Sequence, residues 1–262
     1  MFQHRDAPSR AESKLIRGLH RRKVRDAEGL FLAEGVRGVE DLVASGIPLR
    51  LAVVSPSAEE GDRGRALVRA LGERTTVRRV ADGEIAALAG TESPQGVLAV
   101  AEIPRWSLDA VQPGATATVL VLDGVQDPGN FGTLVRTADA FGVDLVAALP
   151  GTVDPWNPKA VRSAAGASFR IPVVQPSIDR LLAWLRGHGF GIYGAEAGGT
   201  DIGAVRIESR AALVVGNEGA GLSAAVRGAA DALVAIPIAG HAESLNVAVA
   251  AGILLYLLTR RR

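Results

Sequence analysis

Short apolar runs alternate with segments of helical periodicity along most of the chain. Runs too short for helices predict buried strands at residues 30–33, 49–54, 95–101, 119–122, 145–149, 171–174, 190–195, 213–215 and 233–236. Segments whose apolar residues recur every three or four positions predict helices at residues 35–45, 58–71, 130–141, 160–167, 178–187, 223–230 and from about 244 to the end. Interleaved strands and helices predict an α/β fold, with a mostly parallel sheet covered on both faces in the second half.

This pattern divides the chain into two units, residues 28–102 and residues 115–262. The segment between them, residues 103–114, contains two prolines and a polar middle and predicts a linker. Residues 1–27 form a basic arm, because residues 1–26 hold eight Lys and Arg against three acidic residues, while the rest of the chain has a net charge of −4. Such an arm suits a nucleic-acid backbone, and a solvated, frayed terminus explains the same charge equally well.

Composition narrows the class of protein. Of the 262 residues, 48% are hydrophobic and 22% charged, which supports a sizeable core and excludes global disorder. The absence of cysteine excludes a disulfide scaffold, a thiolate nucleophile and a Cys-bearing metal site, and the four histidines lie too far apart to suggest a metal pair. The first residues lack the apolar core of a signal peptide, and the longest apolar run, residues 247–258, is too short to span a bilayer. We therefore expect a cytoplasmic protein without a membrane or metal partner.

One motif match is misplaced. Residues 189–194 fit the G-x-G-x-x-G fingerprint of dinucleotide-binding proteins. That fingerprint has to follow a strand and open a helix, so that the pyrophosphate meets the helix N-terminus. Here the glycines follow a predicted helix and lie in a predicted strand. We interpret them as a helix end and a glycine-tolerant strand.

Three other segments place glycines and polar residues where a predicted strand ends. In residues 122–138 the strand leads into a Pro-Gly turn, with Asn130 as the expected helix N-cap and Arg136 six residues further on. Taken alone, this segment is better explained by a plain cap and a surface cation than by a functional site. In residues 213–222 three glycines flank Asn217 and Glu218, and glycines allow the close backbone approach that suits an adenine or ribose. A flexible loop with solvated side chains is the alternative.

The third segment covers residues 236–247, where a strand is again followed by a polar turn and a helix. Asn246 lies at an apolar helix start, where an unpaired buried amide would cost about 1–3 kcal/mol, so it needs a backbone or ligand partner. His241 has no orienting acid besides Glu243, and we interpret it as a plain loop histidine. All three segments lie at the carboxyl ends of strands, where open α/β sheets bind ligands.

In order and spacing these segments resemble the three signature motifs of the SpoU (TrmH-type) RNA ribose 2′-O-methyltransferases, a branch of the SPOUT superfamily. The first motif runs from Asp127-Pro128-Gly129-Asn130 to Arg136, the second contains Gly216-Asn217-Glu218-Gly219, and the third ends in Ser244-Leu245-Asn246. The resemblance covers residues 115–262. Residues 28–102 resemble the family's substrate-binding domain, which is similar to small ribosomal RNA-binding proteins, through Phe31-Leu-Ala-Glu34-Gly35 and Pro94-Gln95-Gly96-Val97.

The resemblance implies a SPOUT catalytic domain whose C-terminal segment forms a trefoil knot, an exception to un-knotted topology. It implies S-adenosylmethionine as cofactor, bound in the knot, and a homodimer with the active site near the interface. The cofactor contacts that it implies are Gly216, Ile236, Leu245, Asn217 and Gly219. The catalytic residues that it implies are Arg136, Asn130, Glu218, Ser244 and Asn246.

The implied reaction is methyl transfer to a ribose 2′-hydroxyl, without a metal. The family gives Arg136 the role of handling the hydroxyl proton, although a guanidinium stays protonated and is better suited to positioning the hydroxyl and a phosphate. Glu218 is the other possible base. The separate first unit favours large-subunit ribosomal RNA as substrate, because transfer-RNA members of the family often have only short flanking extensions.

Two other functional classes remain open from the sequence. A non-catalytic RNA-binding module of the same fold would bind RNA without a cofactor, but the complete set of polar motif residues speaks against it. A nicotinamide dehydrogenase would depend on the misplaced glycines of residues 189–194.

Overall fold

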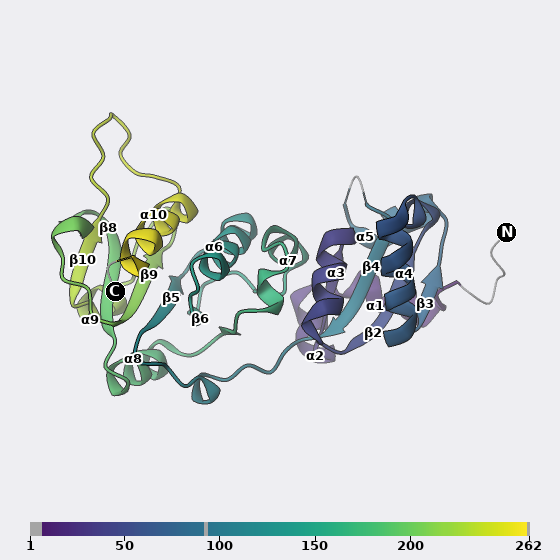
Figure 1. The fold of residues 1–262 in the computed structure, drawn as a ribbon, viewed down its shortest axis with the longest axis horizontal. Helices are drawn as coiled ribbons and strands as arrows, with labels where there is room; N and C mark the ends of the chain where they lie inside the picture. The colour runs from purple at the N-terminus through teal and green to yellow at the C-terminus, as the bar shows by residue number, and fades with distance from the viewer. Residues whose placement is uncertain (1–6, 92–93, 261–262) are drawn as a thin grey trace. The chain divides into compact units, whose positions relative to one another are not determined.

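The computed structural model describes residues 7–91 and 94–260, and the chain divides into two compact units. The first, unit 1, comprises Met1–Arg105 together with Trp156–Phe169, and unit 2 comprises Trp106–Pro155 and Arg170–Arg262. The passage from Arg105 to Trp106 falls inside the expected linker, but the 3-10 helix η2 (Leu108–Ala110) packs into the core of unit 2 through Leu108. Neither of these two units (Figure 1) has the expected continuous boundaries, because residues 156–169 belong to unit 1.

The sheet of unit 1 has four strands in the order β1-β4-β2-β3. These strands are β1 (Leu30–Glu34), β2 (Leu49–Val54), β3 (Val77–Arg79) and β4 (Val97–Glu102). Strand β4 runs antiparallel to β1 and β2, and β3 runs parallel to β2. The apolar pattern does not predict β3, because two of its three residues are arginines.

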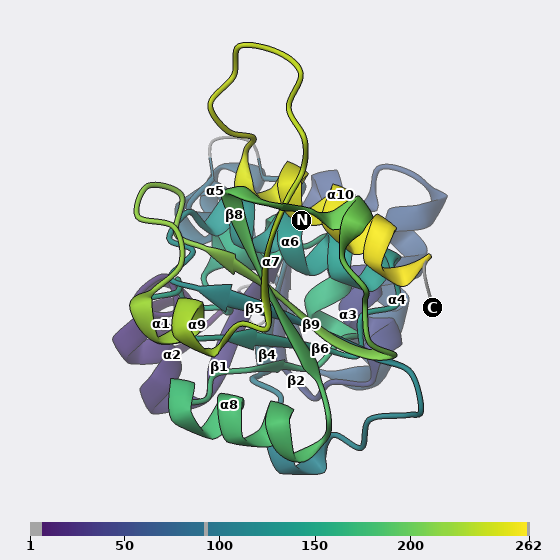
Figure 2. The same ribbon diagram turned by 90° about the vertical axis from the view of Figure 1, so that its left-hand side faces the viewer.

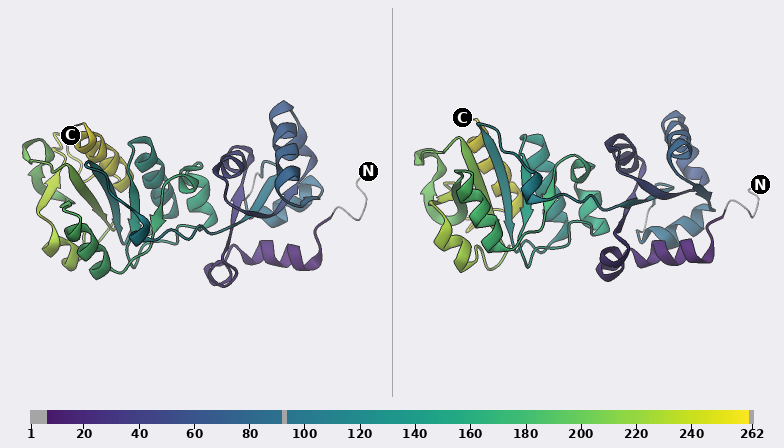
Figure 3. Two further views of the ribbon diagram at one scale, coloured as in Figure 1. Left: turned by 60° about the horizontal axis from the view of Figure 1, so that its bottom comes forward. Right: turned by 90° about the horizontal axis from the view of Figure 1, so that it is seen from below.

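Helices cover both faces of this sheet. The helices of unit 1 are α1 (Arg10–Gly18), α2 (Arg22–Glu28), α3 (Val36–Ser45), α4 (Asp62–Arg74), α5 (Asp82–Ala89) and α7 (Pro158–Ser163), with 3-10 turns η1 (Pro56–Glu59) and η3 (Ala167–Phe169). Figure 3 shows α1 and α4 on opposite sides of the strands. Phe31 of β1 is fully buried and its ring centroid lies 4.5 Å from that of Trp156 and 5.6 Å from that of Phe169. These ring contacts hold residues 156–169 in unit 1.

The basic N-terminal segment is folded rather than frayed over its described length. Helix α1 begins with a capping box, in which the side chains of Ser9 and Glu12 each accept a hydrogen bond from the other residue's backbone N–H. Ile16 and Leu19 are fully buried, and the guanidinium of Arg25, which is 1% exposed, donates to the Leu19 carbonyl at 2.7 Å. The Ser-x-x-Glu sequence signals this helix start. Residues 1–6 of the expected arm lie outside the described residues.

Unit 2 contains a six-stranded sheet in the order β10-β8-β9-β5-β6-β7. Its strands are β5 (Ala117–Asp123), β6 (Leu145–Ala148), β7 (Val173–Val174), β8 (Gly191–Asp201), β9 (Arg210–Gly216) and β10 (Ala232–Ala235). Every pair of neighbouring strands is parallel. The expected parallel α/β sheet is therefore confirmed.

The central strands of unit 2 are buried on both faces. Its helices are α6 (Pro128–Ala140), α8 (Ile178–Gly187), α9 (Ala224–Ala229) and α10 (Val247–Thr259), with the short 3-10 helix η4 (Ile202–Ala204). Helices α8 and α9 pack on one face through Leu181, Leu185 and Val226, whereas α10 contacts β9 and α6 on the other. Figure 2 shows α8 and α10 on opposite sides of β5 and β9. No helix in the described part of the chain is long and apolar enough to cross a bilayer.

Candidate active site

A cavity of about 590 Å³ lies at the carboxyl ends of β9 and β10, beside the middle of β8. Its walls are residues 195–197, the loop after β9, the chain after β10 and the first turns of α10. All five residues expected to contact a cofactor line it, namely Gly216, Asn217, Gly219, Ile236 and Leu245. Glu218, Ser244 and Asn246 line it as well, whereas Asn130 and Arg136 do not.

The loop after β9, residues 217–221, forms one wall of this cavity. Asn217 and Gly221 exchange two backbone hydrogen bonds of 3.0 Å, which fold the loop back on itself. A Cβ at Gly216 would lie 2.3 Å from the carbonyl carbon of Gly221, so only glycine permits this approach. The Asn217 side chain fixes the loop, because its amide donates to the Gly124 carbonyl at 2.8 Å and its oxygen accepts from the Gly219 N–H at 2.9 Å.

The Glu218 carboxylate joins this loop to the loop after β5. It accepts hydrogen bonds from the backbone N–H groups of Gln126 at 3.1 Å and Asp127 at 3.2 Å, and from the Asn130 amide at 3.0 Å. Burial favours the neutral acid, but these hydrogen bonds outweigh it and hold the pKa of Glu218 below its ordinary value. The carboxylate is therefore ionised at neutral pH and a weak base.

Asn130 and Asn246 connect the first and third motif segments. The Asn246 amide donates to the Asn130 side-chain oxygen at 3.0 Å. The Asn246 oxygen accepts from the backbone N–H groups of Ala248 at 2.9 Å and Val249 at 3.4 Å, as the N-cap of α10. Asn246 therefore has a backbone partner, one of the two kinds that the sequence analysis expected, and the Asn130 side chain besides, although it is exposed rather than buried.

The prediction that Asn130 caps α6 is wrong. The N-cap is Asp127, whose carboxylate accepts from the Asn130 backbone N–H at 2.8 Å, while Pro128 begins the helix. Proline suits the first helical position, since its fixed φ is helical and its missing N–H would have no helical partner. The displaced cap leaves the Asn130 side chain free to bridge Glu218 and Asn246.

Arg136 stands apart from this hydrogen-bonded set. It lies six residues after Asn130 on α6, and the two side chains are about 120° apart around the helix axis. Its side chain is exposed and forms no ion pair with any residue in the described ranges. Ser244, in the exposed chain before α10, likewise has no hydrogen bond to a described residue. Both groups are available to a substrate.

One cavity residue was not predicted from the sequence. Glu196 lies in a bulge of β8, because β10 pairs with Gly194 and then with Thr200. One carboxylate oxygen of Glu196 forms an ion pair with Arg227, and the other is buried without a partner among the described residues. The Ala and Gly residues around Glu196 carry no sequence pattern that predicts a bulge.

The glycines of residues 189–194 have the structural role expected for them. Helix α8 ends at Gly187, Gly189 has a left-handed φ of 71°, and β8 begins at Gly191. His241 is exposed in the chain before α10. No group of three His, Asp or Glu side chains suited to a metal ion is present in residues 7–91 and 94–260.

Comparison with known proteins agrees with this geometry. Residues 117–256 match the SpoU rRNA Methylase family, and residues 11–99 match the MRM3-like substrate binding domain. The first match spans more than half of the chain and covers all three motif segments. The chain therefore belongs to the SpoU rRNA methylase family.

Named relatives cover nearly the whole chain. The chain is 39% identical over 241 residues to the 23S rRNA (guanosine(2553)-2′-O)-methyltransferase RlmP of Bacillus subtilis, covering 91% of this chain and 92% of the relative. It is 34% identical over 252 residues to a 23S rRNA (uridine(2479)-2′-O)-methyltransferase of Streptomyces viridochromogenes, covering 93% and 87%. The structure of the SpoU methyltransferase AviRb from the same organism, in complex with the cofactor AdoMet, matches with a TM-score of 0.88 and 32% identity, covering 97% and 98%.

Proposed function

We propose that the protein transfers a methyl group from S-adenosylmethionine to a ribose 2′-hydroxyl of large-subunit ribosomal RNA. The observation that carries the proposal is the continuous set of hydrogen bonds from Glu218 through Asn130 to Asn246, beside a cavity of cofactor size. The rRNA 2′-O-methyltransferases of Bacillus subtilis and Streptomyces viridochromogenes support the same reaction.

The cavity after β9 suits an adenosyl cofactor. Its volume of about 590 Å³ is within the range of small-molecule sites. The close approach of Gly216 to Gly221 presents backbone donors and acceptors to a base, and Leu222, Ile236 and Leu254 supply apolar walls. The unpartnered oxygen of Glu196 is an acceptor still in need of a donor, such as a hydroxyl of the cofactor. The AdoMet complex of AviRb supports this assignment.

The bound cofactor would supply a methyl group on a positively charged sulfur, and that sulfur would be the leaving group when the ribose oxygen takes the methyl group. The chain's own residues position the oxygen. Arg136 can donate two N–H groups to the phosphate beside the target ribose and orient the 2′-hydroxyl. A guanidinium stays protonated in proteins, so Arg136 does not remove the proton, which passes to the substrate phosphate or to water. Glu218, Asn130 and Asn246 hold the motif segments in register, and Ser244 contacts the substrate.

The protein acts as a homodimer in this proposal. Val249, Ile253 and Tyr256 are 53%, 37% and 43% exposed and share one face of α10 at helical spacing. An exposed apolar stripe of this kind marks a protein interface.

The trefoil knot remains a prediction. It concerns the path of residues 237–246, which extend beyond the sheet as a loop between β10 and α10 (Figure 1).

Ribosomal RNA is preferred to transfer RNA because unit 1 accompanies the methylase unit. Residues 11–99 match a substrate binding domain, and the relatives named for 23S rRNA cover 91% and 93% of this chain. Transfer RNA is the alternative outcome of the test.

The test is methyl transfer from labelled S-adenosylmethionine to ribosomal and transfer RNA from cells that lack the gene. A 2′-O-methyl group blocks alkaline cleavage of the next phosphodiester, so ribose label should remain in alkali-resistant dinucleotides of large-subunit RNA. Label in transfer RNA would correct the substrate. Label on bases, or none on any RNA, would overturn the proposal.

A further inference from the structure

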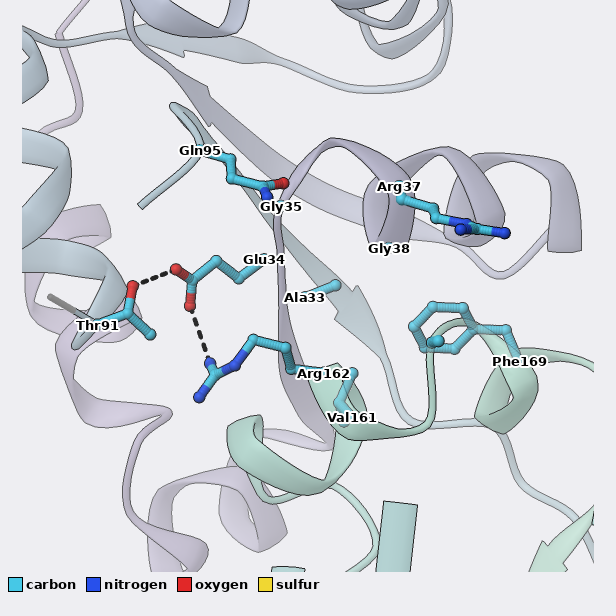
Figure 4. Close-up of a pocket in the computed structure, with 11 residues that line it drawn as sticks. Ala33, Glu34, Gly35, Arg37, Gly38, Thr91, Gln95, Val161, Arg162 and Phe169 are labelled. Atoms are coloured by element: carbon cyan, nitrogen blue, oxygen red, sulfur yellow. Dashed lines mark hydrogen bonds and ion pairs between the residues drawn. The ribbon is translucent and has the colours of Figure 1, made fainter. Parts of the chain in front are cut away.

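A second cavity, of about 440 Å³, lies within unit 1 (Figure 4). It is bounded by the end of β1, the first turn of α3, the chain at Thr91 and Gln95, and residues 161–169. Glu34-Gly35 and Gln95 belong to the two sequence segments that resemble a substrate-binding domain, and here they face one cavity. The third wall comes from residues inside the SpoU-matching range 117–256 that nevertheless belong to unit 1.

The charged groups of this cavity are arranged around Glu34. Its side chain is only 8% exposed, and its carboxylate accepts from the Thr91 hydroxyl and from Arg162 at 3.2 Å. This pair anchors the Arg162 guanidinium, which is 44% exposed and donates to no other residue in the described part of the chain. Arg37, on the first turn of α3, is exposed and has no ion-pair partner among the described residues. Two cations are thus available to an anionic ligand.

The backbone around the cavity is constrained in ways that a surface depression does not require. Gly35 has a φ of 86°, and a Cβ there would lie 2.9 Å from the Gln95 side-chain oxygen, which accepts from the Val36 N–H at 3.1 Å. Ala165, with a φ of 47°, is the one non-glycine residue with positive φ among those described. A left-handed backbone is strained at an alanine, and such strain collects at binding sites. Phe169 supplies an apolar wall (Figure 4).

We propose that this cavity binds an unpaired nucleotide of the RNA substrate, a role that rests on the proposed function. The base lies between Phe169 and Val161, and the phosphates on its two sides meet Arg37 and Arg162, whose side chains point to opposite sides of the cavity (Figure 4). A volume of about 440 Å³ is enough for a nucleotide. Proteins read RNA mainly through unpaired bases that stack on side chains. Unit 1 also has 19 Lys and Arg against 15 Asp and Glu, a net charge of +4, which favours a polyanion.

Gly38 provides a test that leaves every charge in place. It lies inside α3 and lines the cavity, and a Cβ there meets no atom within 4 Å. Gly38→Leu fills the cavity while improving helix propensity, so the variant should fold. Gly72 is an exposed glycine of α4 with the same open surroundings outside the cavity, and Gly72→Leu is the matched control.

The measurement is equilibrium binding of the full-length variants to large-subunit ribosomal RNA from cells that lack the gene. Because stacking of one base contributes roughly a tenfold or larger factor, Gly38→Leu should weaken RNA binding about tenfold and Gly72→Leu should not. Arg37→Ala should weaken it as well, and Arg69→Ala, which removes an exposed charge of α4, should do so less. Affinity for S-adenosylhomocysteine should be equal in all variants.

Equal RNA binding by Gly38→Leu and Gly72→Leu would overturn the nucleotide cavity, even if methyl transfer is intact. Equal losses of RNA affinity in Arg37→Ala and Arg69→Ala would overturn the phosphate contact. Such a result would mean that the positive charge of unit 1 attracts RNA in general, without a specific contact to Arg37. If the wild-type protein binds RNA but methylates none, the proposed function fails, while the two leucine variants still decide the cavity.

Discussion

Glu218 illustrates how single side chains set the geometry of the site. Its carboxylate accepts from two backbone N–H groups and from the Asn130 amide, so its oxygens hold two loops together. Asn217 does the same, because its amide donates to Gly124 in the loop after β5 and its oxygen accepts from Gly219 in its own loop. The side chains of Arg136 and Ser244, by contrast, form no hydrogen bond or ion pair with the described residues of the chain. The polar side chains of the site are therefore of two kinds: those that position its loops, and those that are free to bind a substrate.

Replacing Arg136 should abolish most activity without loss of stability. Loss of an oriented donor costs roughly 100–1,000-fold in kcat, so Arg136→Ala should fall in that range, and Arg136→Lys should recover little because a lysine cannot form the two-pronged contact. Thermal unfolding and cofactor binding should match wild type, because the exposed side chain has no described partner. Arg180→Ala, which removes an exposed arginine of α8, should retain full activity, and a comparable loss there would contradict this role.

Glu218 should stabilise the fold in a pH-dependent manner. The pKa of Glu218 is lowered in the folded protein. At any pH above 4.5, the ordinary pKa of a glutamate, the ionised carboxylate therefore stabilises the native state. That stabilisation is lost as the pH falls through the lowered pKa. Urea unfolding should show Glu218→Gln less stable than wild type at about pH 7, with the difference shrinking below about pH 4. A difference that is constant with pH would contradict the assignment.

At the scale of elements, buried parallel strands and well-capped helices are predictable because their signals are local. Strand β2 and helix α8 have the same bounds in the structure as in the apolar pattern, residues 49–54 and 178–187. The predicted helix at residues 160–167 is shorter, because the chain leaves the helical region at Ala165 and Gly166. Strand β3 escapes prediction because its register depends on its neighbour β2.

Helical glycines should respond to alanine according to their surroundings. A Cβ at Gly72 meets no atom within 4 Å, whereas one at Gly64 would lie 1.8 Å from the Ala58 carbonyl oxygen. Gly72→Ala should raise the free energy of unfolding by about 0.4–1 kcal/mol, because it reduces the entropy of the unfolded chain. Gly64→Ala should lower it. Urea denaturation measures both, and equal effects would contradict the described packing of α4 against η1.

The exposed stripe of α10 should control assembly. Ile253→Glu places a charge in the middle of the stripe formed by Val249, Ile253 and Tyr256, and should convert a dimer to monomers. Sedimentation equilibrium measures the change. The control is Ala66→Glu, at an exposed position of α4. A monomeric wild-type protein would remove the dimer from the proposed function, and a dimeric Ile253→Glu variant would show that the dimer does not form through this stripe.

At the scale of the whole molecule, tertiary contacts override the order of the sequence. Unit 1 takes residues 156–169 from the middle of the methylase-matching range, because Phe31 stacks against Trp156 and Phe169. The bridge from Glu218 to Asn130 likewise spans 88 residues. Neither the discontinuous unit nor this long-range hydrogen bond can be predicted from the pattern of apolar residues along the chain. The motif residues were identifiable from spacing and resemblance, whereas Glu196 and the Glu34 cavity became visible only in three dimensions.

Phe31→Ala should reveal this discontinuous unit. Truncating a fully buried phenylalanine costs about 3–5 kcal/mol, and here it also removes the partner of Trp156. Unit 1 should lose stability, with Trp156 reporting its unfolding by fluorescence once Trp106 and Trp184 have been replaced by phenylalanine. Unchanged unfolding of the Trp156 signal would contradict the assignment of residues 156–169 to unit 1.

The central claim is that Arg136 and the Glu218–Asn130–Asn246 set serve ribose methylation of large-subunit RNA. The most direct measurement maps alkali-resistant linkages in ribosomal RNA from cells lacking the gene, supplied with either wild-type protein or Arg136→Ala. The account predicts one resistant linkage in the large-subunit RNA that wild type restores and Arg136→Ala does not. An identical map in the cells that lack the gene, with or without either protein, would contradict the account. So would restoration of the resistant linkage by Arg136→Ala.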